Sequence, residues 1–268
     1  MFGFFFRNSG GQLPQLFWHT DIHSHVCPGI DDGSPSPQTS VRLVSQMADL
    51  GFTRMIVTPH VTDETFPNTP AIISRSYMAL REACAKAGLT MRFGCSAEYR
   101  IDELLMDMLE KGIVTPLPGN CLLVENAWYQ EPFGLDEFLY NLQNEYGYTP
   151  IMAHPERFPY YHNHLDRLQE LHASGAYLQV NLLSLAGHYG RTIKQTAEWL
   201  LAHDLVSFVG SDLHRERHLE SIRNYLRSKD YRKLEAKAHL ILNDRLDLEA
   251  TAAEKSATAQ PAGAEARQ

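Results

Sequence analysis

The sequence predicts an α/β protein in which a parallel sheet closes into a barrel. From residue 16 to about residue 210, short runs of β-branched or aromatic residues alternate with amphipathic helical runs. Seven strand–helix pairs follow one another in this way, and the βαβ crossover favours parallel strands. The eighth pair of a regular (β/α)8 barrel is not visible, and the last segments are helical.

The expected elements follow from these periodicities. Strands are predicted at 16–24, 54–60, 90–99, 120–126, 148–154, 176–181 and 205–212. Helices are predicted between and after them at 40–51, 74–88, 101–112, 134–147, 164–175, 192–204, 217–228 and 230–242. Several helical runs end in glycine, which is a common helix stop. No internal repeat is apparent, so the pattern indicates one domain over 16–245.

Both ends of the chain differ from this domain. Residues 1–15 form an N-terminal extension with a Phe-rich patch, which we expect to pack on the domain or to make a weak contact with a membrane or a membrane-anchored partner. The patch is too short for a signal peptide, and no stretch has the length of a membrane span. Residues 246–268 are rich in alanine with little else apolar, so this tail is predicted to be disordered.

Composition narrows the functional classes. A formal net charge of −8 argues against binding nucleic acid by phosphate neutralisation. The four cysteines form no CxxC pair, which favours reduced thiols in a cytoplasmic protein. Cys95 has Arg100 five residues on, one short of the spacing in a cysteine-dependent phosphatase loop, so a thiol nucleophile is not expected.

Potential metal ligands stand at the ends of six of the seven strands. Catalytic groups of α/β barrels lie at the C-terminal ends of the strands, so these residues should meet on one rim. The sixth strand, ending at Asn181, supplies no such residue. The candidate ligands are His23, His25, Asp32, His60, Glu98, Glu125, His154, Asp212 and His214.

Local spacing supports a metal site. His23/His25 and Asp212/His214 are i, i+2 pairs, so each pair faces one side of an extended strand. Glycines and prolines around Asp31 and Asp32 suit a turn that returns a carboxylate over the first strand. Each residue alone is more often structural, whereas the joint pattern indicates metal binding. The mixed N/O ligands suit Mn²⁺, Fe²⁺ or Zn²⁺ better than Ca²⁺, and nine ligands imply two or three ions.

Five segments carry a resemblance to a known family. HTDIHSHVCPGIDDGSPS, MIVTPH, GCSAEYR, AHPERF and GSDLH resemble the signature segments of the PHP (polymerase and histidinol phosphatase) superfamily. They are most similar to its bacterial protein-tyrosine phosphatase branch, the CpsB/YwqE type associated with capsule and exopolysaccharide synthesis. The resemblance spans about residues 19–245. It implies a distorted (β/α)7 TIM-like barrel, the PHP fold, with a trinuclear site that often holds manganese.

The resemblance also implies roles for single residues. One metal would take His23, His25, Glu98 and Asp212, and a second would take Glu98, Glu125 and His154, with Glu98 bridging. A third would take Asp32, His60 and His214. Arg157 would bind phosphate, and Arg217 is the weaker candidate for a second phosphate contact, because neither it nor Arg215 has the expected spacing.

These features predict a metal-dependent protein-tyrosine phosphatase. Clustered divalent ions would bind the phosphoryl oxygens and activate a water as the nucleophile. Tyr99, Phe158, Tyr160 and Tyr161 are candidates to line a pocket for the phosphotyrosine ring. The resemblance implies a substrate in the tail of a membrane-anchored bacterial tyrosine kinase.

Two other functions stay open at this point. One is a histidinol-phosphate phosphatase or another small-molecule phosphoesterase of the same fold, and the other is a non-catalytic metal-binding module. The oligomeric state and a role for Cys27 other than packing or redox sensitivity also stay open.

Overall fold

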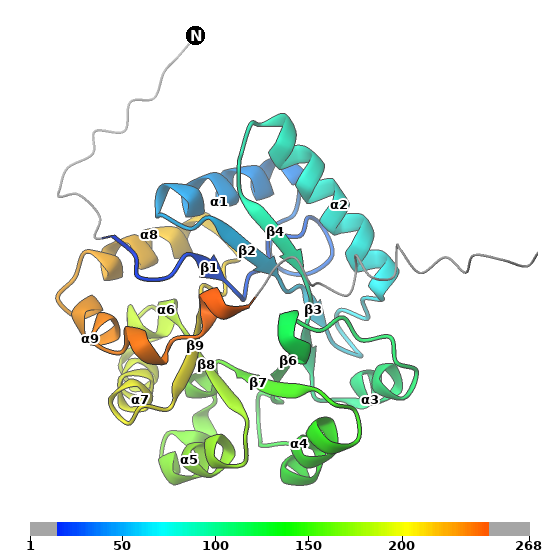
Figure 1. Cartoon of the computed structure of the whole chain (residues 1–268), viewed down its shortest axis with the longest axis vertical. Coiled ribbons are helices and arrows are strands. Elements are labelled where there is room, and N and C mark those ends of the chain that lie inside the picture. The colour runs from blue at the N-terminus through cyan, green and yellow to red at the C-terminus, as the bar shows by residue number, and fades with distance from the viewer. Residues whose placement is uncertain (1–14, 247–268) are drawn as a thin grey trace, which may run out of the picture.

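The computed structural model describes residues 15–246, which form a parallel barrel surrounded by helices (Figure 1). The predicted N-terminal extension and the predicted disordered tail lie outside these residues, apart from Gln15 and Leu246. Within the described part of the chain, no helix is both long and apolar enough to cross a membrane.

Nine short strands occupy the seven predicted strand positions. They are β1 (Thr20–Asp21), β2 (Arg54–Val57), β3 (His60–Val61), β4 (Arg92–Cys95), β5 (Glu98–Arg100), β6 (Cys121–Glu125), β7 (Thr149–Ala153), β8 (Tyr177–Asn181) and β9 (Val206–Gly210). All pairs are parallel, in the orders β1-β2-β4 and β3-β5-β6-β7-β8-β9. The predicted parallel α/β architecture is therefore confirmed.

Two predicted strands are each interrupted once. Residues 54–60 divide into β2 and β3 around Pro59, which has no N–H to donate to a neighbouring strand. Residues 90–99 divide into β4 and β5 at Ser96 and Ala97. Hydrogen bonds from Ser96 N to Val57 O and from Glu98 N to Pro59 O join the two sheets across these breaks. The pieces therefore act as two continuous barrel strands.

The barrel closes between its first and last strands. Asp212 N donates to His23 O at 2.9 Å, and His25 N donates to Leu213 O at 3.0 Å. The regular part of the first strand is shorter than the predicted 16–24, because side chains replace part of its ladder. Asp244 accepts from His19 N, and the Asp21 carboxylate accepts from Ser211 N.

Helices cover the outside of the barrel (Figure 1). They are α1 (Pro37–Asp49), α2 (Pro70–Lys86), α3 (Glu103–Glu110), α4 (Leu135–Asn144), α5 (Leu165–Ala173), α6 (Leu182–Leu185), α7 (Arg191–Ala202) and α8 (Glu216–Leu226). The ninth, α9 (Tyr231–Glu235), is much shorter than the predicted helix at 230–242. The chain turns after α9 through short 3-10 turns at Ala238–Leu240 and Asn243–Arg245.

Strand alternation divides the apolar core into two layers. Ile56, Leu123 and Ile151 belong to a small cluster inside the barrel. Their neighbours of opposite parity, such as Met55 and Leu122, belong to the large cluster between strands and helices.

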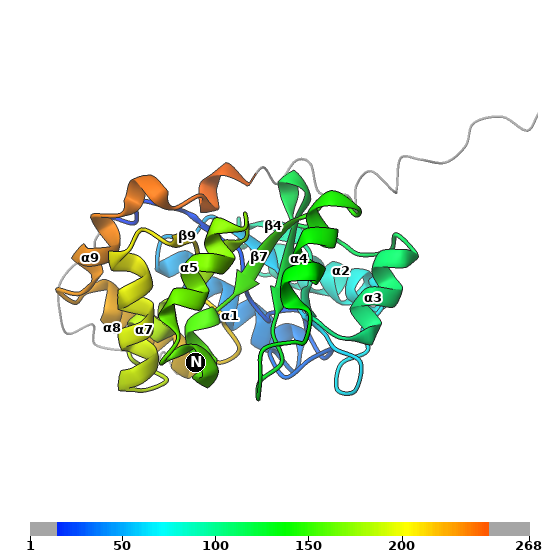
Figure 2. The ribbon, with the colours of Figure 1, turned by 90° about the horizontal axis from the view of Figure 1, so that it is seen from below.

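The turn after α9 joins two strands at the N-terminal end of the barrel, which lies along the upper edge of Figure 2. The fully buried Asn243 side chain donates to Thr20 O and Val209 O and accepts from Val209 N, at 2.7 to 3.0 Å. It therefore links β9 to β1 at the end where these strands lack a regular ladder.

We expect Asn243→Ala to lower the free energy of unfolding by about 2–4 kcal/mol, since it leaves buried backbone groups on β1 and β9 without partners. Urea unfolding followed by circular dichroism measures this loss. Arg245→Ala is the matched control, because Arg245 is exposed two residues away. Equal stabilities of the two variants would contradict a stapling role for Asn243.

Candidate metal centre

The nine predicted ligand side chains lie together at the C-terminal end of the barrel. They form overlapping groups whose nitrogen and oxygen atoms lie within 4.8 Å of one another. Each comes from a strand end or from the loop after it, which explains how positions far apart in the sequence meet. They are His23, His25, Asp32, His60, Glu98, Glu125, His154, Asp212 and His214.

The deepest group contains His23, His25, Glu98 and Asp212. His23 Nε2 lies 3.2 Å from His25 Nε2, and Glu98 Oε2 lies 3.3 Å from both nitrogens. Asp212 Oδ1 lies 3.8 Å from His23 Nε2 and 3.4 Å from His25 Nε2. All four side chains are at most 2% exposed. The i, i+2 spacing of His23 and His25 therefore does bring two imidazoles to one point.

A second group forms around the other oxygen of Glu98. Glu98 Oε1 lies 2.9 Å from His154 Nε2, and Glu125 Oε1 lies 3.9 Å from the same nitrogen. The remaining oxygen of Glu125 accepts from Arg100 Nη2 at 2.9 Å. Glu98 thus presents its two oxygens to two different sets of side chains.

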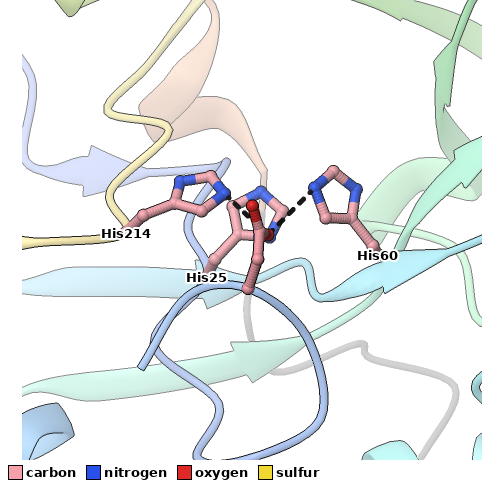
Figure 3. A group of neighbouring side chains, drawn as sticks. His25, His60 and His214 are labelled. Carbon is pink, nitrogen blue, oxygen red and sulfur yellow. Dashed lines mark ion pairs between the residues drawn. The ribbon is translucent and has the colours of Figure 1, made fainter. Parts of the chain in front are cut away.

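A third group lies nearer to solvent. Asp32 Oδ1 lies 3.6 Å from His60 Nε2 and 3.3 Å from His214 Nε2. Figure 3 shows His25, His60 and His214 directed toward one another from separate segments. The rings of His25 and His214 stack with centroids 4.0 Å apart, so the third group adjoins the first.

The adjacent Asp31 and Asp32 have different environments. Asp31 has a fully buried side chain and accepts from His25 Nδ1 at 2.9 Å, from Gly33 N and from His60 N. A carboxylate on the far nitrogen orients a ligating imidazole. The loop can lie against the first strand because Gly33 has no Cβ, which would stand 2.1 Å from His25 O.

Strand β8, the sixth of the predicted strands, orients two of the candidate ligands, a role that was not predicted from the sequence. Gln179 Oε1 lies 2.7 Å from His23 Nδ1, and Gln179 Nε2 donates to Asn181 Oδ1. Asn181 Nδ2 in turn donates to Asp212 Oδ2 at 2.7 Å. Gly210 makes room for this chain, since a Cβ there would lie 2.7 Å from Gln179 Nε2. Alternate polar residues on an otherwise buried strand were the available signal.

Two of the candidate ligands have an unusual backbone. His154 has φ of +32° and Asp212 has φ of +49°, a region that non-glycine residues rarely adopt. Such conformations persist only where the surroundings enforce them, and they concentrate at functional sites.

The electrostatics of the site depend on opposite charges at close range. Burial of Glu98 opposes its ionisation, but the imidazoles of His23 and His60 outweigh it and hold the pKa of Glu98 well below its usual value. Burial likewise lowers the pKa of His23, but Glu98 and Asp212 outweigh this effect and raise it to about 10.

The geometry fits cations better than it fits hydrogen bonds. Among the described residues, Glu98 Oε2 has no hydrogen-bond partner, although His23, His25 and His60 nitrogens lie within 3.3 Å of it. A buried carboxylate oxygen without such a partner is costly. Tetrahedral ligands at about 2.1 Å from a metal are about 3.4 Å apart. The distances between His23 and His25, and from these two imidazoles to Glu98 and Asp212, run from 3.2 to 3.8 Å and match this spacing.

An open pocket of about 480 Å³ lies over these groups. Asp32, His60, Glu125, Asp212 and His214 reach its floor or walls. Cationic side chains from three parts of the chain complete it, namely Arg100, Arg157, Arg215 and Arg217. Both arginines that the sequence analysis singled out therefore face the pocket.

Arg157 is held at the pocket wall by several contacts. Its Nη1 donates to Asp212 Oδ2 at 2.8 Å, and the guanidinium lies over the rings of Tyr189 and Trp128 at 4.5 and 5.3 Å. Its buried Nε has no hydrogen-bond partner among the described residues. Arg217 is exposed at the start of α8.

The aromatic residues predicted to line the pocket do not line it. Tyr99, Phe158 and Tyr161 are at most 1% exposed and pack in the core, and Tyr160 donates its hydroxyl to Ala127 O. Phe66, Trp128 and Tyr189 line the pocket instead. These residues lie in loops, where no helical or strand periodicity predicts which way a side chain points.

Cys27 has a packing role. Its side chain is fully buried in the large core cluster, and burial raises the pKa of its thiol well above the usual value. The thiol is therefore protonated and shielded from solvent, which disfavours redox sensitivity.

Comparisons with known proteins agree with this geometry. The chain is 29% identical over 195 residues to the tyrosine-protein phosphatase YwqE of Bacillus subtilis, covering 72% of this chain and 76% of that protein. It is 28% identical over 202 residues to the tyrosine-protein phosphatase CpsB of Streptococcus pneumoniae, covering 72% and 82%.

A solved structure supports the same relationship. It comes from crystallographic work on YwqE from Bacillus subtilis and CpsB from Streptococcus pneumoniae, described as metal-dependent tyrosine phosphatases. It superposes with a TM-score of 0.72 at 27% identity, over 84% of this chain and 94% of that one. The family described as capsular polysaccharide synthesis, CpsB/CapC, matches residues 19–243. The chain belongs to the CpsB/CapC family.

Proposed function

We propose that this chain is a metal-dependent protein-tyrosine phosphatase, which hydrolyses the phosphate ester of phosphotyrosine in a protein. The observation that carries this proposal is the convergence of five imidazoles and four carboxylates beneath a pocket whose wall holds Arg157. Family membership and the activity named for YwqE and CpsB support it.

We assign the ligands to two or three divalent ions, with manganese favoured and iron or zinc as alternatives. His23, His25, Glu98 and Asp212 would hold one ion, and Glu98, Glu125 and His154 would hold a second. Asp32, His60 and His214 would hold a third. When bound, such ions supply positive charge for the phosphoryl oxygens and lower the pKa of a coordinated water toward neutrality.

The residues of the pocket then bind and orient the substrate. Arg157 would bind the phosphoryl group with its free guanidinium edge, since Asp212 fixes the opposite edge and two rings hold its plane. Arg217 would supply a second, more mobile contact. Trp128 and Tyr189 would flank the tyrosyl ring, because both line the pocket beside Arg157.

The substrate would be a phosphorylated protein in the cytoplasm. A pocket open to solvent accommodates a side chain presented by a larger molecule, and the family association with capsular polysaccharide synthesis points to a bacterial tyrosine kinase as partner. Membrane anchoring of that kinase belongs to the same proposal.

The substrate class is tested with two phosphate esters. We expect the manganese-loaded protein to release phosphate from a phosphotyrosine peptide with a kcat/KM at least about tenfold above that for histidinol phosphate, because the pocket offers aromatic walls. Phosphate release is measured directly. A preference for histidinol phosphate would favour the small-molecule alternative, and no turnover of any phosphoester by the metal-loaded protein would favour a non-catalytic module.

The ligand assignment is tested by removing one imidazole. We expect His154→Ala to lose bound metal and to lower kcat/KM by more than about 100-fold, since changes even to outer-shell partners cost about 10–100-fold. Elemental analysis and phosphatase assay measure the two effects. His239→Ala is the control, because His239 is exposed on the turn after α9. Full metal content and full activity in His154→Ala would show that the assignment is wrong.

Metal binding should release protons. In the metal-free protein the raised pKa of His23, about 10, keeps its imidazole protonated at neutral pH, and a cation must displace that proton. Affinity should therefore rise as pH rises from 6 to 8, with release of about one proton or more. Calorimetric titration with Mn²⁺ in buffers of different protonation enthalpy measures this number. Identical heats in all buffers would contradict the expectation.

A further inference from the structure

The loop between β6 and α4 exposes two aromatic side chains that the catalytic site does not use. Tyr129 is 95% exposed and Phe133 is 104% exposed, so neither ring is covered by any described residue. We call these two residues the aromatic ridge. Large aromatic side chains that are fully exposed are typical of contact surfaces, because covering them removes apolar area from water.

Hydrogen bonds to the rest of the domain hold the loop that carries the aromatic ridge. Glu131, which lies between Tyr129 and Phe133 in the sequence, accepts from Arg167 Nε and Nη2 at 2.9 to 3.1 Å, and from Tyr161 OH at 2.7 Å. The Asn126 side chain at the start of the loop also donates to Tyr161 OH. A partner would therefore meet an ordered surface and would lose little binding energy in ordering the loop.

The ridge is continuous with the catalytic pocket. Trp128 lies next to Tyr129 in the chain, lines the pocket and packs its ring edge-on against Phe158 at 5.7 Å. The guanidinium of Arg157 lies over the Trp128 ring, 5.3 Å from its centroid. A peptide whose phosphotyrosine enters the pocket would thus pass its neighbouring residues over the ridge.

The charges around the ridge indicate which substrate residues it would bind. Residues 126–145 contain four carboxylates and no lysine or arginine. A hollow of about 350 Å³ beside Glu131 is also lined by Asp166, Arg167 and Glu170. Arg167 forms ion pairs with Glu131, Asp136 and Glu170, and one cation leaves this group of carboxylates with a net negative charge. The pocket is lined by four arginines, Arg100, Arg157, Arg215 and Arg217, together with the carboxylates of Asp32, Glu125 and Asp212. The arginines therefore gather on the pocket side of Trp128, whereas the loop after Trp128 and α4 are net acidic.

We propose that the aromatic ridge binds basic residues on one side of the phosphotyrosine in a protein substrate. This inference rests on the proposed phosphatase function and adds a sequence preference to it. Arginine side chains would stack on the Tyr129 and Phe133 rings through cation–π contacts, with the acidic side chains of the loop and α4 adding attraction. Acidic flanking residues would be repelled there.

The test compares two phosphotyrosine peptides that carry either arginine or glutamate at the two positions on each side of the phosphotyrosine. We expect wild type to prefer the arginine peptide by about tenfold in kcat/KM, mainly through KM. The double variant Tyr129→Ala/Phe133→Ala should lose most of this preference. It should hydrolyse p-nitrophenyl phosphate, which is too small to reach the ridge, within about twofold of wild type.

Two further variants separate the ridge from general effects. Met78→Ala, which removes an exposed apolar side chain from α2, should leave all three substrates unchanged. Glu137→Lys, which reverses an exposed charge on α4, should raise kcat/KM for the glutamate peptide relative to the arginine peptide. If the double variant retains the wild-type preference, or loses activity equally on all three substrates, the inference is wrong.

Other outcomes would assign the ridge to a different binding partner or contradict the proposed phosphatase function. A wild-type dimer that dissociates in the double variant, seen by analytical ultracentrifugation, would assign the ridge to a second copy of this chain and overturn the inference. Flotation of wild type but not of the double variant with phosphatidylglycerol vesicles would assign it to a membrane and overturn it as well. Absence of turnover by wild type on any substrate would instead contradict the proposed phosphatase function.

Discussion

One buried carboxylate, Glu98, organises the site. It is fully buried at the start of β5. Its Oε2 faces the imidazoles of His23, His25 and His60, and its Oε1 faces the imidazole of His154. A charged group in this position is costly unless positive charge surrounds it on several sides. The histidines supply part of that charge, and their lone pairs converge on points that hydrogen bonds do not satisfy. The arrangement of the other ligands follows from this requirement.

The barrel meets this requirement by bringing strand ends together and then fixing the side chains. Asp31, in the loop after β1, orients His25. On β8, Gln179 orients His23 and Asn181 orients Asp212. At the opposite end, the Asn243 side chain links β9 to β1. The positions of the candidate ligand side chains therefore depend on hydrogen bonds from both ends of the barrel.

Much of this could be predicted from the sequence, because repeated strand–helix periodicity and ligand types at strand ends are both local signals. The break between β2 and β3 lies at Pro59, a signal in the sequence that the strand prediction did not use. The shortening of β1 was not predictable, since it depends on the distant side chain of Asp244 and on the contact of Asp21 with Ser211. The different environments of Asp31 and Asp32 depend on how one turn lies over His25. The pocket aromatics were predicted wrongly, because loop residues such as Trp128 and Tyr189 have no periodicity that reveals their direction.

Under the proposed assignment, Glu98 would give one carboxylate oxygen to each of two cations. Anomalous diffraction at the manganese edge, from crystals of the manganese-loaded protein, tests this assignment most directly. We expect at least two anomalous peaks, one on each side of the Glu98 carboxylate, with His23 and His25 beside one and His154 beside the other. A single peak remote from Glu98, or no peak among these residues at saturating manganese, would contradict it.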